Sequence, residues 1–498
     1  MDFDIQVTGG AITNSLASAR EASGWASLTS TPPLQLSGTA TMAGTEGTFT
    51  MILDSRGRFA QRIAGPISVA TGFDGERCWV EDIGGERRLQ ELSDRESTIL
   101  AGLLMTGQWM APQAPLKLEP APDAADGGHS LRFTLVDGEL AGTIELDPAS
   151  QRIRKASYSV GAATHTLAFS GEVRHGGIVF PAKVERSSST GISTIIHIDH
   201  ADKAPDFIRS PFEPVLSPPD DVSFDAKAPA ALEIKKAPTG HLLVHPTVSG
   251  KNLGWFIFDS GAGSNCLDAR AAEALGAEKF GQVPAIGIGG HTNASFARPE
   301  SLTLGPATLD HPLLVVMDLA FLDGPMREKI AGIIGYGLLH RVVAEIDMEG
   351  PSVSLHNPAT YDAARASWSP LAIDSRAACV QGEFEGHKGW FRLDTGAGSS
   401  FVQMHAPAVE RFKLLDGRTT LPTANGGVGG AAAAQQGVLR DFTLGGRRTE
   451  NVPATFATEA KGAFATPYTL GNIGGGLLRP FTLVMDYQHN RIAFVERK

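Results

Sequence analysis

The chain has 498 residues, of which 42% are hydrophobic and 19% charged, and its formal net charge is −11. This length leaves room for about two to four domains, and the acidic balance without any basic cluster argues against nucleic acid and anionic membrane surfaces as partners. The longest apolar run, residues 99–105, is far shorter than the roughly 20 residues that a transmembrane helix needs, so no transmembrane segment is expected.

The start of the chain does not resemble a secretory leader. Residues 1–4 lack a basic start, and no apolar stretch follows them. A leader removed before this start would leave the same sequence, and in that case a periplasmic or other extracytoplasmic location is favoured. The sequence alone leaves the localisation open.

Residues 1–205 are expected to form a separate β-rich domain. Short apolar and β-branched runs alternate with Gly, Asp and Pro turns, and one amphipathic helix is expected to begin at a cap near Ser93 and to end near Met110. The pattern resembles the half-barrel domains of bacterial lipoprotein carriers, and the role of this domain stays open. The expected strands lie at 34–53, 130–135, 141–146, 165–169, 177–184 and 194–198.

A proline-rich stretch follows this domain. Six prolines lie between residues 205 and 229, and proline is excluded from helix interiors and from central strands. We therefore expect a linker over 206–230, followed by two further domains over 231–360 and 361–498.

Two copies of one motif dominate the rest of the chain. Residues 255–264 and 390–399 are each an apolar run that ends in Asp-Ser/Thr-Gly-Ala-Gly-Ser. An apolar run cut by glycines predicts a buried strand that enters a tight loop. Asp259 and Asp394 would then lie where these strands leave the core, 135 residues apart. Since burying a lone carboxylate is costly, each is the expected partner of the other.

The repeat continues beyond the motif. A glycine-rich stretch, a Leu/Phe-Thr-Leu-Gly segment and a Gly-x-Ile-Gly segment follow each aspartate in the same order. In the last of these, 332–335 corresponds to 471–474, and in both copies the next leucine lies nine positions before an aspartate (338 to 347 and 477 to 486). These matched landmarks indicate an internal duplication.

These residues resemble the retropepsin and pepsin-type aspartic peptidases. The resemblance covers roughly residues 231–498 and implies the single-chain form, in which two β-barrel lobes each contribute one aspartate. It implies that Asp259 and Asp394 activate a water that hydrolyses a peptide bond, with neither a cofactor nor a metal. The substrate would be a peptide or protein, and the chain would work as a monomer because it carries both halves of the site.

Several neighbours of the two aspartates have expected supporting roles. The resemblance implies that the hydroxyls of Ser260 and Thr395 bond across to the opposite lobe. Gly261 and Gly396 would let the backbone approach the carboxylates closely. The glycine-rich stretches 287–292 and 426–430 would form flaps over the substrate. The flap residues proposed are Gly289, Gly290, His291, Gly429 and Gly430.

Some of these residues also fit other interpretations. His241 and His245 have a metal-ligand spacing, but a solvated strand face is the expected fate of both. The aspartates could instead cap their own loops, which explains one motif but not the repeated frame. Two rival functions also stay open. One is a peptide- or lipid-binding protein on an inactive peptidase scaffold, and the other is an envelope or carrier protein whose function lies in residues 1–205.

Overall fold

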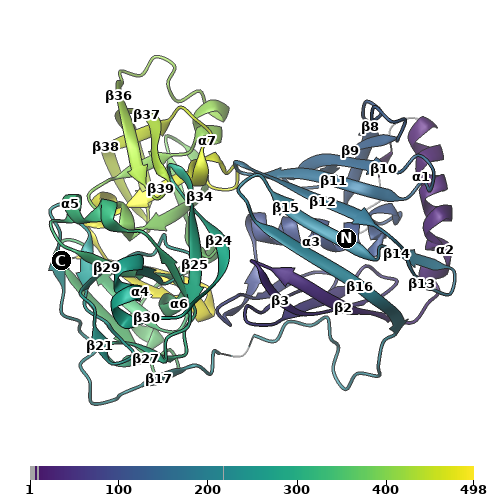
Figure 1. Cartoon of the computed structure of the whole chain (residues 1–498). Coiled ribbons are helices and arrows are strands. Elements are labelled where there is room, and N and C mark those ends of the chain that lie inside the picture. Colours follow the sequence, from purple (N-terminus) through teal and green to yellow (C-terminus); the bar gives the residue numbers. More distant parts are fainter. Residues whose placement is uncertain (1–5, 8–9, 217, 498) are drawn as a thin grey trace. The chain divides into compact units, whose positions relative to one another are not determined.

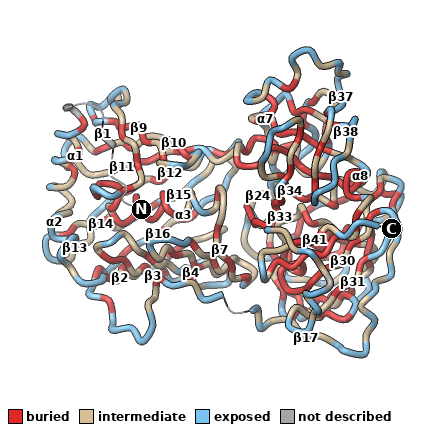
Figure 2. The backbone as a smooth tube through the Cα atoms, turned by 180° about the vertical axis from the view of Figure 1, so that it is seen from behind, coloured by how far each residue is buried: buried red, intermediate tan, exposed pale blue. Residues whose placement is uncertain are grey.

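The computed structural model describes residues 6–7, 10–216 and 218–497, and the chain is mainly β (Figure 1). It divides into two compact units, Met1–Ser217 and Pro218–Lys498. The division falls inside the stretch 206–230 that the sequence analysis assigns to a linker. In each unit the buried residues follow the strands and the exposed ones follow the turns (Figure 2). None of the described helices is both long and apolar enough to cross a membrane.

The first unit is built on one extended sheet, in which 14 strands are described. All neighbouring strands pair antiparallel except β1 and β8, and the buried positions alternate with exposed ones along most strands, as expected for a sheet with one covered face. The strands in spatial order are β1 (Gln6–Val7), β8 (Leu116–Pro120), β9 (Ser130–Leu135), β10 (Ala141–Leu146), β11 (Ile153–Val160), β12 (Ala163–Ser170), β15 (Lys183–Ser188), β16 (Ser193–Lys203), β2 (Leu34–Met42), β3 (Thr45–Leu53), β4 (Phe59–Ala64), β5 (Val69–Phe73), β6 (Cys78–Glu81) and β7 (Arg87–Gln90).

The expected helix of this unit is present, but it ends at Thr106 rather than near Met110. Helix α3 spans Leu92–Thr106 and is followed by Gly107, whose φ of 73° lies in the left-handed region that stops a helix. A separate 3₁₀ turn, Gln108–Met110, follows. The expected cap near Ser93 is wrong, because the residue before the helix is Glu91, whose side chain makes no capping bond.

Two further features of the first unit differ from the sequence expectation. Helices α1 (Gly10–Ser23) and α2 (Trp25–Leu28) were not predicted. The expected strand over 177–184 is split into β14 (Ile178–Phe180) and β15, because Pro181 lies between them and cannot donate a ladder hydrogen bond. Strand β14 pairs instead with β13 (Val173–His175).

The second unit begins earlier than the sequence analysis expected. Strand β17 (Val222–Phe224) lies inside the expected linker, yet it pairs antiparallel with β27 (Ala307–Asp310). The prolines flank this short edge strand rather than interrupt it. Part of the expected linker is therefore a strand of the second unit's fold.

The two lobes of the second unit repeat one strand frame. In the first, β22 (Trp255–Phe258) pairs parallel with β29 (Ile330–Ile334), β29 pairs antiparallel with β23 (Cys266–Asp268), and β23 pairs parallel with β28 (Leu314–Met317). In the second lobe, β34 (His387–Asp394) pairs parallel with β39 (Gly471–Gly474), and β39 pairs antiparallel with β35 (Val402–Met404). Strand β35 then pairs parallel with β38 (Arg447–Ala457). A short helix follows each loop, α4 (Ala269–Leu275) and α7 (Ala406–Arg411).

The lobes also share a sheet and a core. The predicted terminal hairpins, β30–β31 (Val343–Asp347, Ser352–His356) and β40–β41 (Phe481–Asp486, Arg491–Glu496), pair with each other through β30 and β40. One buried apolar cluster includes Phe258 and Ile334 of the first lobe together with Leu393 and Ile473 of the second. These shared contacts hold the two motif loops in one compact unit.

The remaining strands of the second unit complete the lobes. They are β18 (Lys235–Lys236), β19 (Leu242–Val244), β20 (Thr247–Val248), β21 (Lys251–Asn252), β24 (Lys279–Gly287), β25 (Gly290–Ala297), β26 (Ser301–Leu304), β32 (Trp368–Asp374), β33 (Ala377–Phe384), β36 (Leu421–Gly427) and β37 (Gly430–Leu444); its short helices are α5 (Asp323–Met326), α6 (Tyr336–Leu339) and α8 (Gly475–Leu478).

Candidate active site

The two motif aspartates lie at the ends of buried parallel strands. The residues of β22 before Asp259 are apolar and largely buried, and the Asp259 amide donates to the Ile334 carbonyl of β29 at 2.9 Å. Asp394 ends β34, opposite Gly474 of β39. Both aspartates are half-buried. The equivalent strands of the two lobes therefore each place one carboxyl group at the site.

Ser260 and Thr395 lock the two loops together. The Ser260 hydroxyl donates to the Leu393 carbonyl at 2.8 Å, and the Thr395 hydroxyl donates to the Phe258 carbonyl at 3.0 Å. Each hydroxyl oxygen also accepts from the other residue's backbone amide, at 2.9 and 3.1 Å. Both side chains are completely buried. The hydrogen bonds between the two lobes are therefore reciprocal.

The glycines after these residues let the carboxyl groups approach each other. A Cβ placed on Gly261 would lie 2.8 Å from Asp394 Oδ1, and one placed on Gly396 would lie 2.3 Å from Asp259 Oδ2. Both distances are shorter than real side-chain contacts, so neither position has room for a side chain. Each glycine lies against the aspartate of the other lobe, and the two carboxyl groups therefore share one site.

The hydrogen bonds to the two carboxyl groups differ. Asp259 Oδ1 accepts from the Gly261 amide at 2.8 Å and from the Gly396 amide at 3.2 Å. Asp394 Oδ2 accepts from the side-chain amide of Asn472 at 2.8 Å. Asp259 is therefore held by two backbone amides, whereas the donor to Asp394 is a side-chain amide. The site is thus chemically asymmetric although its frame is repeated.

Burial and mutual repulsion make this pair hold a proton. Burial, followed by the charge of Asp259, raises the pKa of Asp394 to about 7. Burial also raises the pKa of Asp259, while the backbone amides of Gly261, Gly396 and Ala262 and the nearby His241 act in the opposite direction. Two carboxylates at one site cannot both ionise cheaply, so the pair titrates as a unit. With its fixed amide donors, Asp259 is the better place for the negative charge.

Asn472 belongs to a buried polar chain that the sequence analysis missed. His405 Nε2 donates to Asn472 Oδ1 at 2.9 Å, and His405 Nδ1 accepts from the hydroxyl of Thr469 at 3.2 Å. Burial lowers the pKa of His405 to about 3, which keeps the ring neutral near pH 7. Comparison of the two copies could have pointed to a polar role for Asn472, because it stands in an otherwise apolar segment where the first copy has Ile333.

His241 also lies at the site, contrary to the expected solvated strand face. Its Nε2 donates to the Gly396 carbonyl at 2.6 Å, and burial lowers its pKa. It lies just before β19, and the residue it contacts comes from the other lobe, 155 positions later. His245 lies 3.0 Å from the Asn252 side chain instead. No cluster of three or more His, Cys, Asp or Glu that could hold a metal is found among the described residues.

The two predicted flap stretches form hairpin tips that meet each other. One tip joins β24 to β25, and the other joins β36 to β37. The Gly289 amide donates to the Val428 carbonyl at 3.1 Å, and a Cβ on Gly289 would lie 2.1 Å from the Gly430 backbone. Gly290 and Gly429 also approach closely, so the two tips touch through backbone. His291, by contrast, is exposed.

A family model matches the part of the chain that carries both motifs. A family model described as aspartyl protease matches residues 244–338 and 380–478, which contain one motif each. No curated protein matches the chain. Among solved structures, the chain is similar to an aspartic proteinase from Irpex lacteus at 13% identity and a TM-score of 0.34, over 54% of this chain and 97% of that one. The family match supports an aspartic peptidase family for the part of the chain that carries both motifs.

Proposed function

We propose that the chain is an aspartic endopeptidase of the single-chain, two-lobed retropepsin or pepsin type. The observation that carries this proposal is the reciprocal contact at the site, where Gly261 lies against Asp394 and Gly396 against Asp259. A structural cap on each loop would need no such contact between lobes. A shared site for two carboxyl groups, with one proton between them, is what water activation requires.

The asymmetry of the site supports one division of roles between the two aspartates. Asp259, as the carboxylate, takes a proton from a water molecule, whose oxygen attacks the carbonyl carbon of the scissile bond. Asp394, as the acid, gives its proton to the carbonyl oxygen. The resulting tetrahedral diol breaks its C–N bond as the nitrogen takes the proton held by Asp259, and one diol hydroxyl returns a proton to Asp394. The dyad ends as it began, so no covalent enzyme intermediate forms.

The paired hairpin tips have a role in this proposal as well. The tips contact each other through glycine backbone and through Val428, whose side chain packs on an apolar cluster of the first lobe and would have to leave it when the tips part. We propose that the tips part to admit an extended peptide and then close over it. Closure would exclude bulk water from the charges that develop in the transition state. The residues concerned are Gly289, Gly290, His291, Gly429 and Gly430.

The test is incubation of the full chain with an unstructured protein such as reduced, alkylated casein between pH 4 and 8, followed by mass spectrometry. New internal termini that pepstatin suppresses support the proposal. Intact casein that nevertheless binds the protein would favour the alternative, a peptide-binding protein on a peptidase scaffold.

A further inference from the structure

The sheet faces beside the two aspartates have opposite polarity, although the lobes repeat one strand frame. Matching pairings of the four central strands fix which positions correspond. The hairpins extend the correspondence to β24 and β36, because Gly287 pairs with Gly290 as Gly427 pairs with Gly430. The first face consists of Ile257, Cys266, Val283, Ala285, Val315 and Ile333, and the second face, in corresponding order, of Arg392, Gln403, Thr423, Asn425, Thr455 and Asn472. An apolar side chain or a thiol in the first face is thus matched everywhere by a polar or charged one in the second.

The first face is apolar and already holds a side chain of the other lobe. Each of its residues belongs to, or packs against, one apolar cluster, as does Ala262 of the motif loop. Val428, from the hairpin tip of the second lobe, packs on the same cluster. Val283, Ala285 and Val315 are only partly buried, so they leave surface for a ligand. An apolar substrate side chain would replace Val428 there when the tips part, and its burial would be favourable.

The second face is hydrogen-bonded instead. Asn425 Oδ1 accepts from the side-chain amide of Gln403 at 3.2 Å and from the hydroxyl of Thr455 at 3.1 Å. Asn472, which pairs with Gln403 across the ladder, donates to Asp394 Oδ2. Thr455 is only partly buried. These residues form a band of neutral donors and acceptors that runs from the dyad to the hairpin strand β36.

The charge on the second face is compensated. Arg392 lies 3.5 Å from the carboxylate of Asp374, and Asp374 is completely buried. A charged substrate side chain would lose its hydration here without gaining an uncompensated partner charge from this pair. An aliphatic one would cover Thr455 and its neighbours without donating or accepting a hydrogen bond, which is costly as well. A neutral side chain with both a donor and an acceptor fits this face best.

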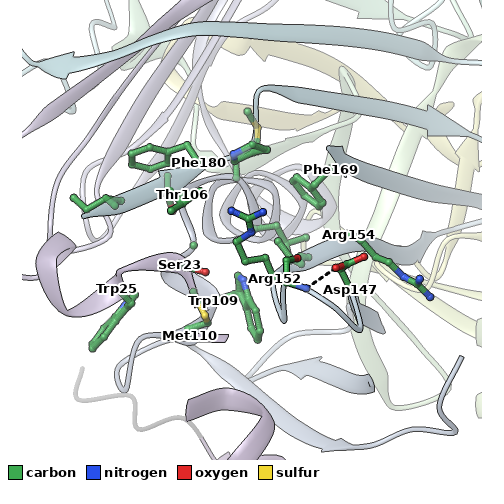
Figure 3. A pocket seen from close by; sticks show the side chains of 18 of the residues that line it. Ser23, Trp25, Thr106, Trp109, Met110, Asp147, Arg152, Arg154, Phe169 and Phe180 are labelled. Carbon is green, nitrogen blue, oxygen red and sulfur yellow. Dashed lines mark hydrogen bonds between the residues drawn. The ribbon is translucent and has the colours of Figure 1, made fainter. Parts of the chain in front are cut away.

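We propose that the site prefers peptides with an apolar side chain on one side of the scissile bond and a neutral polar one, such as glutamine, on the other. In an extended peptide neighbouring side chains point to opposite sides, so the two residues that flank the bond would face different lobes. The apolar one would lie on the first face and the polar one on the second. This inference rests on the proposed peptidase function. All its residues lie in the second unit, so it does not involve the cavity of about 370 Å³ beside Trp109 in the first unit (Figure 3).

The test uses the full chain and four peptides that differ only in the two residues flanking the scissile bond, which are Leu-Leu, Leu-Gln, Gln-Leu and Gln-Gln. Mass spectrometry identifies the bond that is cleaved. One of the two mixed orders should have a kcat/KM at least about tenfold above the other three peptides, because a mismatched side chain leaves polar groups unpaired. Any other ranking overturns the proposal.

Glutamate in place of glutamine tests whether the preferred polar side chain is neutral. At pH 6, where an exposed glutamate is ionised, the glutamate peptide should be cleaved at least about tenfold more slowly than the glutamine peptide. Equal or faster cleavage would overturn the assignment of a neutral side chain.

A variant of the second face tests which residues set the preference. The double substitution Asn425→Ala, Thr455→Val gives the second face the residues that the first has at 285 and 315. The ratio of kcat/KM for the preferred mixed peptide to that for Leu-Leu should fall about tenfold. Thr449→Val makes the same change on the same strand, but opposite Phe442 and outside the face, and should leave the ratio unchanged.

Melting curves show whether each variant is folded. If the double variant does not fold, Val315→Thr decides, because it makes the first face more polar and should raise cleavage of Gln-Gln relative to the preferred mixed peptide. Unchanged ratios in the folded variants would overturn the proposal. Peptides cleaved in a pepstatin-sensitive way but without the preference would reject this inference alone. If neither casein nor the four peptides are cleaved, the peptidase proposal fails and the inference falls with it.

Discussion

Replacing Asn472 by Ile should shift the alkaline limb of the pH–rate profile upward. The substitution gives the second lobe the residue that the first lobe has at Ile333, and it removes the donor that lies 2.8 Å from Asp394 Oδ2. That donor stabilises the ionised form of Asp394. Without it the acid holds its proton to higher pH, so the pKa of Asp394 rises above its value of about 7.

The size of the shift follows from the hydrogen bond that is lost. A hydrogen bond to a charged group contributes about 1.5–3 kcal/mol, and one pKa unit corresponds to about 1.4 kcal/mol. Because Asp394 is half-buried and water can replace part of the bond, we expect a shift of about one unit. The assay is kcat/KM against pH with a fluorogenic peptide chosen from the casein products.

The same substitution leaves the Nε2 group of the buried His405 without its acceptor, Asn472 Oδ1. An unsatisfied buried group costs about 1–3 kcal/mol, so the melting temperature should fall as well. His405→Phe is the control, because Phe464 already stacks on this ring and the Asn472 donor stays in place. We expect it to lower stability with a much smaller shift of the limb. An unmoved or lowered alkaline limb in folded Asn472→Ile would refute the assigned role of Asn472.

Three further predictions concern the organisation and the pH range of the enzyme. The fragment 218–498 should fold and cleave peptides without the first unit. A fragment that begins at residue 231 should be less stable, because it lacks β17. If the fragment 218–498 is inactive while the full chain is active, the first unit is required. Activity per molecule should stay constant on dilution, and a loss at low concentration without adsorption would argue against a monomer. The double substitution Ala262→Thr, Ala397→Thr should move the pH optimum down from mildly acidic or neutral values, since a hydroxyl donor favours the ionised dyad; an unshifted profile in a folded protein would reject this reasoning.

The repeat made much of the second unit predictable. Each motif is a local pattern, and the strand, loop and helix that it predicts depend on residues close to it in the sequence. The pairing of Asp259 with Asp394 could be inferred because both copies keep one frame. The contact between Gly289 and Gly430 could not, since it depends on how two hairpins from different lobes meet.

The errors share one physical cause, which is contact between residues far apart in the sequence. His241 was assigned to a solvated face because its own neighbours are strand-like, yet its environment is set by Gly396 of the other lobe. Residues 222–224 lie among prolines, and only their pairing with β27 makes them a strand. Asn472 could have been noticed against Ile333, but its partner His405 is fixed by the fold.

In the proposed mechanism Asp259 and Asp394 act as one catalytic unit. The direct measurement is the turnover number of Asp259→Asn, Asp394→Asn and the double variant on the same peptide, with melting curves to confirm folding. We predict that each single variant loses nearly all activity and that the double variant is hardly worse than either. A folded single variant that keeps most of its activity would contradict the claim.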